Sequence, residues 1–311
     1  MLALSITAGS SLYGLSGAPG ALTSCRNDKC GFTGVLFSGV LGHENSLGLV
    51  LILLIPLLFA LRDRLVRLLA GAAVGILVLA SGSRTSLIAL LAVGSVWLLL
   101  AIRSRHRTST LRVAIRRLAL LAPVAGFAVA TFLVVSSRDN PGAFTGRSQL
   151  WNLAVSAIAE DPLFGRGLYG WADIRQSTGA FGASAGYSPH NQFLDVALQG
   201  GVFAAAGLVG LTLLWIKQGW DGFLPSTLYV TALAWAGISE RPVSFGLPDW
   251  SSVGLIAGIL LLAANWRCVD TETGNSTMGF LDAAGRSVGT ISGSNAKQTP
   301  PAIRSQLHLR K

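Results

Sequence analysis

Seven apolar runs dominate this sequence, and they constrain its fold more than any other feature. Each approaches the roughly 17–25 residues that a helix needs to cross the hydrocarbon core of a bilayer. The runs cover residues 46–61, 68–83, 86–102, 118–135, 193–216, 224–239 and 251–266. Inside a bilayer a single segment satisfies its own backbone hydrogen bonds only as a helix. We therefore predict an all-α, multi-pass transmembrane helical bundle of about seven spans.

The composition agrees with a membrane protein. Of 311 residues, 51% are hydrophobic and 12% are charged, about half the charged fraction of an ordinary soluble domain. The net charge of +10 would suit nucleic acid, but most of the excess lies in short loops beside apolar runs, where basic residues set topology and meet anionic lipid. No zinc-finger, helix-turn-helix or RNA-recognition signature occurs. We expect a lipid bilayer and no nucleic acid as partner.

The distribution of arginine and lysine orients the bundle. Loops 62–67 and 103–117 are rich in arginine, which predicts that they face the cytoplasm and that the long polar loop lies outside. The chain then divides into an extracytoplasmic N-terminal segment, a transmembrane domain and a disordered cytoplasmic tail. These parts cover residues 1–45, residues 46–266 with an outer loop at about 136–192, and residues 267–311.

The N-terminal segment contains Cys25 and Cys30, five residues apart in a polar loop. In an oxidising compartment this pair can form a local disulfide, and the spacing leaves open whether it does. A metal site would need further ligands, and only His43 is near. We therefore predict no metal site in this segment.

The outer loop gathers the groups that bind phosphate and move protons. It contains Arg138, Arg147, Arg166 and Arg175 and ends at the dipeptide His190-Asn191. Guanidinium groups match phosphate oxygens in a bidentate fork, and imidazole titrates near neutral pH. This combination predicts an anionic, phosphate-bearing substrate and a proton transfer outside the membrane.

Four local patterns follow one another along the chain. They are Gly42-His43-Glu44-Asn45-Ser46-Leu47-Gly48; Ser81-Gly82-Ser83-Arg84-Thr85; Gly146-Arg147-Ser148-Gln149-Leu150-Trp151, closing at Asp161-Pro162-Leu163-Phe164-Gly165-Arg166-Gly167; and Ser188-Pro189-His190-Asn191-Gln192-Phe193-Leu194. In this order, over roughly residues 35–215, they resemble the O-antigen ligase and polymerase family of bacterial envelope glycosyltransferases.

The resemblance implies a multi-span helical enzyme of the inner (cytoplasmic) membrane. Such an enzyme takes a glycan from an undecaprenyl-diphosphate carrier and transfers it to a hydroxyl of a glycan or lipid acceptor on the outer face. It does so without a nucleotide sugar, a metal or any other cofactor. Family members usually have ten or more spans, so we expect this chain to lack N-terminal spans and to be the C-terminal part of a longer membrane protein.

The resemblance also assigns roles to single residues. His190 would be the general base, with Asn191 as its hydrogen-bond partner, and Arg84 and Arg147 would bind the diphosphate. For Arg84 the hydroxyls of the two neighbouring serines and of Thr85 and the amides at a helix start would help; the competing interpretation is that Arg84 snorkels to the interface. Arg147 shares a helix face with Trp151, which we expect at the lipid interface.

Three further interpretations stay open at this point. Arg147 could instead form a surface salt bridge with Asp139 or Glu160. Arg166, between two glycines, suits either a phosphate contact or an ordinary turn. Asn45 is a candidate helix N-cap that could line the site.

Two other classes of function compete with the glycosyltransferase. A transporter or flippase of a lipid-linked anionic substrate would place ionisable groups at mid-membrane, and the apolar runs contain almost none. A non-catalytic truncated remnant follows if the missing spans are essential. We favour the glycosyltransferase.

Overall fold

The computed structural model of the chain describes residues 5, 8–9, 12–14, 16–25, 29–59, 61, 63–102, 109–137, 140, 147–178, 189–238, 240–243 and 250–273. Within these residues the chain forms a two-stranded hairpin, a short 3-10 helix and a series of α-helices. In chain order they are β1 (Leu22–Ser24), β2 (Val35–Phe37), η1 (Gly39–Leu41), α2 (Glu44–Leu58), α3 (Arg64–Ser81), α4 (Arg84–Ile102), α5 (Ser109–Leu120), α6 (Ala122–Ser136), α7 (Arg147–Glu160), α8 (Gly170–Thr178), α9 (Gln192–Trp220), α10 (Leu224–Gly237) and α11 (Trp250–Thr273).

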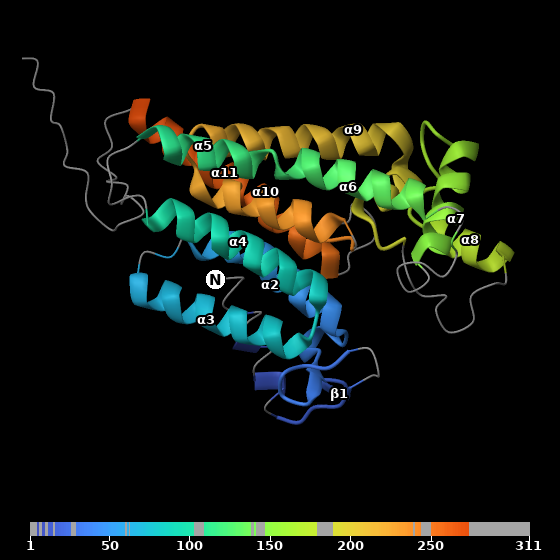
Figure 1. The fold of residues 1–311 in the computed structure, drawn as a ribbon, viewed down its shortest axis with the longest axis horizontal. Helices are drawn as coiled ribbons and strands as arrows, with labels where there is room; N and C mark the ends of the chain where they lie inside the picture. Colours follow the sequence, from blue (N-terminus) through green and yellow to red (C-terminus); the bar gives the residue numbers. More distant parts are fainter. Residues whose placement is uncertain are drawn as a thin grey trace, which may run out of the picture.

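The long helices lie side by side along the long axis of the molecule, with α9 at one edge and α3 at the other (Figure 1). The short helices α7 and α8 gather at one end, where they pack against α9. β1 and β2 pair antiparallel, with Leu22 opposite Phe37, and β2 packs against α3.

The centre of the bundle is α10. It packs against α2, α4, α6 and α9, and 11 of its 14 residues are buried. A helix that is apolar on every side belongs in an interior. Trp215 of α9 connects α10 to α11. Its ring packs against that of Tyr229 with 4.8 Å between centroids, and its indole N–H donates to the Gly258 carbonyl at 2.9 Å.

The structure confirms the helical class and corrects several boundaries. Every apolar run overlaps a helix, but the fourth is divided at Leu121 between α5 and α6, the first begins at Glu44, and α11 continues to Thr273, into the predicted tail. The all-α prediction also missed the hairpin. Residues 274–311 of the tail and 103–108 of the inner loop lie outside the described residues.

Within the described part of the chain, α3 and α9 are long and apolar enough to cross a membrane; the apolar parts of α2, α4 and α11 are shorter. The 14 residues of α10 reach only about 21 Å, against a hydrocarbon core of about 30 Å. A helix surrounded by other helices has no lipid to match, which explains its length. The seven-span arrangement therefore stays a prediction.

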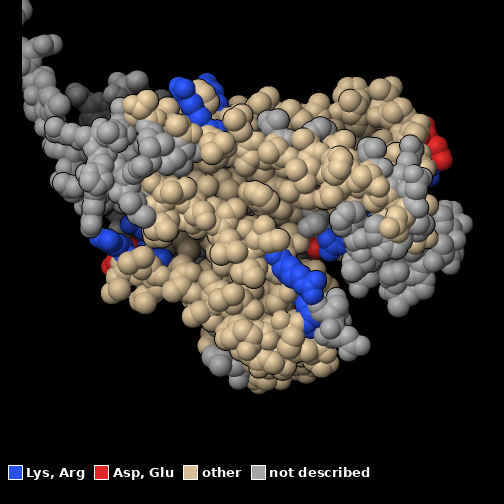
Figure 2. Space-filling view, viewed as in Figure 1, with Lys and Arg blue, Asp and Glu red and all other residues tan. Residues whose placement is uncertain are grey.

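The outward faces of the long helices are apolar. Leu69 of α3, Leu91 of α4 and Leu213 of α9 are each about three-fifths exposed. Figure 2 shows a surface that is largely tan over the helices and interrupted by charge in few places. A large contiguous apolar surface marks a protein or membrane contact, as expected of lipid-facing helices.

Candidate active site

His190 has an uncommon backbone conformation. Its φ is +49°, the only positive φ among the described residues other than glycine. This left-handed region is disfavoured for side chains with a Cβ, although histidine enters it more readily than most. The residues on both sides hold it there. The Trp151 indole donates to the Pro189 carbonyl at 2.8 Å, and Asn191 caps α9. Backbone strain of this kind is typical of functional sites.

A single carboxylate, Glu240, joins the predicted base to a predicted arginine. Nδ1 of His190 lies 2.8 Å from Oε2 of Glu240, and the Arg147 guanidinium donates to Oε1 at 2.8 Å. The Glu240 side chain is only 5% exposed, so water screens these contacts little. Glu240 follows α10 and Arg147 opens α7, so the site is built from segments far apart in sequence.

The surroundings of Glu240 favour its ionised form. Burial alone would raise the pKa of this carboxyl, but the hydrogen bond and charge of His190 and the charge of Arg147 together bring the pKa below its ordinary value. An ionised carboxylate can only accept hydrogen bonds. Nδ1 of His190 must therefore carry a proton in either form of the ring, so Nε2 is the nitrogen that can accept a proton when the ring is neutral.

The start of α9 is hydrogen-bonded to the segment that carries Glu240. The Asn191 amide donates to the Ile238 carbonyl at 3.2 Å, while its oxygen accepts from the amides of Phe193 and Leu194. Gln192 exchanges two hydrogen bonds with the Val243 backbone, at 2.7 and 2.8 Å. Asn191 therefore serves as the helix cap and not as the expected partner of the imidazole, which Glu240 contacts instead.

Arg147 and Trp151 lie one turn apart in α7, and both are directed toward this cluster, as their spacing predicted. The lipid-interface position expected for Trp151 is wrong, because its ring is only 2% exposed inside the protein and its N–H is used by Pro189. The carboxylate paired with Arg147 is Glu240 rather than Glu160; the other candidate, Asp139, lies outside the described residues.

Arg84 is the first residue of α4 and is exposed. It lies at the same end of the bundle, because a Cβ on Gly48 of α2 would meet Ser86 Oγ at 2.5 Å. The predicted help from the two serine hydroxyls is wrong. Ser81 and Ser83 are buried, and their hydroxyls bond to the Val78 carbonyl and to Ser86. The helix start and the guanidinium remain as groups that could meet an anion.

Arg166 is placed apart from the cluster around Glu240. Its guanidinium pairs with Glu160 and lies 3.9 Å from Asp161, and its backbone N–H donates to the Leu198 carbonyl at 2.7 Å. Of the two glycines beside it, Gly165 serves packing, since a Cβ there would lie 2.6 Å from the Gly201 nitrogen, where α9 kinks. A Cβ on Gly167 would meet nothing within 4 Å, and its φ of +73° is a left-handed turn conformation. These contacts favour the turn over the phosphate contact.

Asn45 is not the N-cap of α2. His43 has that role, with Nδ1 accepting from the Asn45 backbone N–H at 3.2 Å. The Asn45 side chain instead donates to Glu240 Oε1 at 3.4 Å and accepts from Lys29. These two contacts support the predicted position of Asn45 at the site, although Asn45 is not a helix cap.

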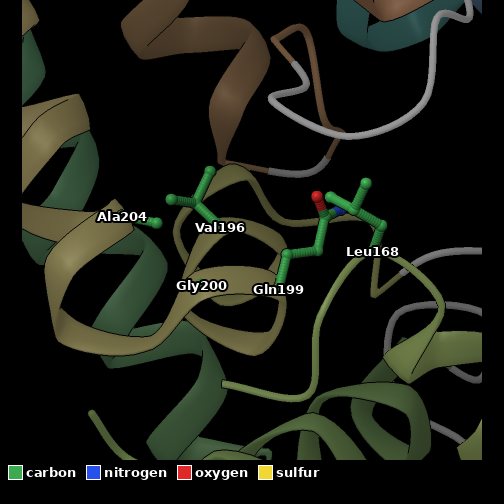
Figure 3. Close-up of a pocket in the computed structure, with 5 residues that line it drawn as sticks. All are labelled: Leu168, Val196, Gln199, Gly200 and Ala204. Carbon is green, nitrogen blue, oxygen red and sulfur yellow. The ribbon is translucent and has the colours of Figure 1, made fainter. Parts of the chain in front are cut away.

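A small hollow of about 80 Å³ lies beside the α9 kink. Figure 3 shows Leu168, Val196, Gln199, Gly200 and Ala204 around it. Its lining is almost entirely apolar, which suits a hydrocarbon group better than a sugar. Within the part of the chain that the structure describes, no group of His, Cys, Asp and Glu side chains could hold a metal ion.

Sequence reasoning missed Glu240 and Lys29. The available signal for Glu240 was an acid in the polar tetrad Ser239-Glu240-Arg241-Pro242, directly after an apolar run. An acid at a membrane boundary is costly without a partner. For Lys29 the signal was weaker, a lysine beside a paired cysteine. The structure joins Cys25 to Cys30 in a disulfide.

Comparison with known families places these residues in context. Residues 69–209 match the family model described as O-antigen ligase. The matched range contains Arg84, Arg147, His190 and Asn191, whereas Asn45 and Glu240 lie outside it. No protein of curated function matches the chain.

Proposed function

Because this chain belongs, over residues 69–209, to the O-antigen ligase family of membrane enzymes, we propose that it transfers a glycan from an undecaprenyl-diphosphate carrier to an acceptor hydroxyl. The observation that carries the proposal is the contact of Glu240 with both His190 and Arg147. A positioned base beside a cation suits a reaction in which a hydroxyl loses a proton and a phosphate leaves.

The proposed step uses the geometry of the cluster directly. The acceptor hydroxyl gives its proton to Nε2 of His190 while its oxygen attacks the anomeric carbon of the glycan. The bond between that carbon and the carrier diphosphate breaks, and its electron pair stays with the diphosphate oxygen. The imidazolium that forms faces the Glu240 carboxylate at 2.8 Å, which stabilises the new positive charge.

Arg84 and Arg147 are our candidates for the diphosphate. The carrier diphosphate gains negative charge as the bond breaks, so donors aimed at it stabilise the transition state more than the ground state. A guanidinium carries its N–H donors in a planar fork that matches phosphate oxygens, and Arg147 already lies beside the proposed base through their shared contact with Glu240. Arg166, balanced by Glu160 and Asp161, is a weaker candidate for the same role.

We place this end of the bundle outside the inner membrane. The arginine-rich loops 62–67 and 103–117 then face the cytoplasm. The Cys25–Cys30 disulfide supports this orientation, since disulfides persist in oxidising compartments such as the periplasm and are rare in the cytosol.

The central test replaces the base. Membranes that contain the full chain are given an undecaprenyl-diphosphate-linked oligosaccharide and acceptor, and transfer is measured as a mass shift of the acceptor. His190→Ala should lower kcat by about 10²-fold or more at unchanged protein level. His308→Ala, in the tail beyond the described residues, is the matched control. Wild-type transfer by His190→Ala would overturn the proposed mechanism.

A further inference from the structure

Lys29 reaches the site from the N-terminal segment. Its Nζ lies 3.1 Å from Oε1 of Glu44 and also donates to Oδ1 of Asn45. The lysine side chain is 9% exposed, and a largely buried ammonium is stable only with such partners. The charge of Glu44 balances that of Lys29, so this lysine is suited to hold neighbouring groups in place rather than to bind a substrate anion.

The Asn45 amide connects Lys29 to Glu240, and its orientation has a chemical cause. An ammonium only donates hydrogen bonds, so the atom that faces Lys29 must be the amide oxygen. A carboxylate only accepts, so the atom that faces Glu240 Oε1, at 3.4 Å, must be the amide nitrogen. A flipped amide would bring two oxygens together at Glu240 and two donors together at Lys29. Lys29 and Glu240 together therefore allow only one orientation of the Asn45 amide.

The residues beside Lys29 are held by a disulfide and by close packing against the turn between α3 and α4. Cys30, the next residue, is bonded to Cys25. A Cβ on Gly31 would lie 2.5 Å from the Ala80 carbonyl oxygen, and one on Gly82 would lie 3.1 Å from that of Cys30. Cys30 and Gly31 thus pack against the turn between α3 and α4, directly before Arg84.

We propose that Lys29 is a positioning residue of the glycosyl transfer. Held beside the Cys25–Cys30 disulfide, it orients Asn45 and through it the Glu240 carboxylate that aligns His190. This inference rests on the proposed function. It adds Lys29 of the N-terminal segment to the site and makes the alignment of the base depend on the Cys25–Cys30 disulfide. Breaking the disulfide should therefore act in the same direction as removing the lysine.

The kinetic test uses Lys29→Met and Lys29→Arg in membranes that contain the full chain. Lys29→Met should lower kcat about 10-fold, because a displaced catalytic group loses rate, with KM changed less than about twofold. Lys29→Arg keeps the donor and should restore most of the rate. In a Glu240→Gln background, Lys29→Met should have no further effect, since the two residues act through one contact. A raised KM at unchanged kcat, or additive losses, would overturn the proposal.

A second measurement does not depend on transfer. The rate at which diethyl pyrocarbonate modifies His190, followed by mass spectrometry, reports how firmly the imidazole is held. Lys29→Met, and Cys25→Ser combined with Cys30→Ser, should each raise that rate severalfold, while modification of His308 stays unchanged. If His190→Ala retains transfer but Lys29→Met still raises the modification rate, the proposed function fails and the positioning role stands. If Lys29→Met changes neither kcat nor the modification rate, Lys29 has no such role.

Discussion

At the scale of single residues, Glu240 decides what His190 can do. The carboxylate contacts Nδ1 of His190 and the Arg147 guanidinium at 2.8 Å each, which fixes both the tautomer and the direction of the ring. A histidine without such a partner would distribute its proton between two nitrogens and rotate more freely. The predicted base is thus part of a three-residue unit, and the properties of that unit can be tested one residue at a time.

We expect Glu240→Gln to lower kcat by about 10²-fold or more, because a neutral amide no longer specifies the tautomer and leaves a partly buried arginine without its counter-charge. Transfer by membranes with equal amounts of inserted protein measures the effect. Glu160→Gln is the matched control, since Glu160 is 65% exposed and pairs with Arg166. Equal activity of both variants would contradict the role of Glu240.

The lowered pKa of Glu240 predicts a pH dependence of stability. A carboxyl whose pKa falls on folding stabilises the protein above its ordinary pKa of about 4.5, and this contribution is lost as pH falls through the folded-state pKa. The thermal midpoint of the wild type should exceed that of Glu240→Gln at pH values well above the ordinary carboxyl pKa. The difference should narrow below about pH 4.5. A difference that widens in acid would contradict the assignment.

Arg84→Lys and Arg147→Lys should each lower turnover, with the alanine variants worse, because lysine keeps the charge and loses the bidentate fork. The addition of EDTA should have no effect on the rate. Arg67→Lys serves as control, since Arg67 lies in the first turn of α3 with its guanidinium over the Phe59 ring. Full activity of both lysine variants would contradict a bidentate contact between these arginines and the diphosphate. Loss of activity in EDTA would indicate that the reaction needs a metal ion.

At the scale of elements, the kink in α9 determines where the loop after α7 can lie. Gly201 adopts φ 59° and ψ −153°, a region open only to glycine. The N–H groups of Arg166 and Val202 donate to Leu198 and Pro162 across this junction. The kink therefore attaches the Asp161–Gly167 turn to the same helix whose start is capped beside His190.

Gly201→Ala should lower the thermal midpoint of the solubilised protein by several degrees, because the added Cβ would lie 2.3 Å from the Leu163 carbonyl oxygen. Transfer should fall with it. Gly207→Ala in the same helix meets nothing within 4 Å and should be neutral or slightly stabilising, since alanine is the better helix former. Equal midpoints for the two variants would show that the kink tolerates a side chain.

At the scale of the whole molecule, the proposed orientation puts α8 and the site outside and the start of α5 inside. With Cys268 replaced by serine, a cysteine introduced at Ser177 should react with an impermeant maleimide in intact spheroplasts. A cysteine at Ser109 should react only after permeabilisation. The reverse labelling pattern would contradict the proposed topology, because it would put the disulfide in the cytoplasm and the arginine-rich loops outside.

The helical class follows from the amino-acid sequence alone, because apolar runs of this length must satisfy their backbone hydrogen bonds within a helix. The sequence also indicated which histidine and which arginines to consider, because those groups stand out in polar segments. It could not identify Glu240 as their partner, since 50 residues separate Glu240 from His190 and 93 separate it from Arg147, and no local period relates them. Only the packing of α9 against both α10 and α7 brings them together. The same holds for Asn45, whose local pattern suggested a cap while the tertiary structure supplied Lys29 and Glu240 as its partners.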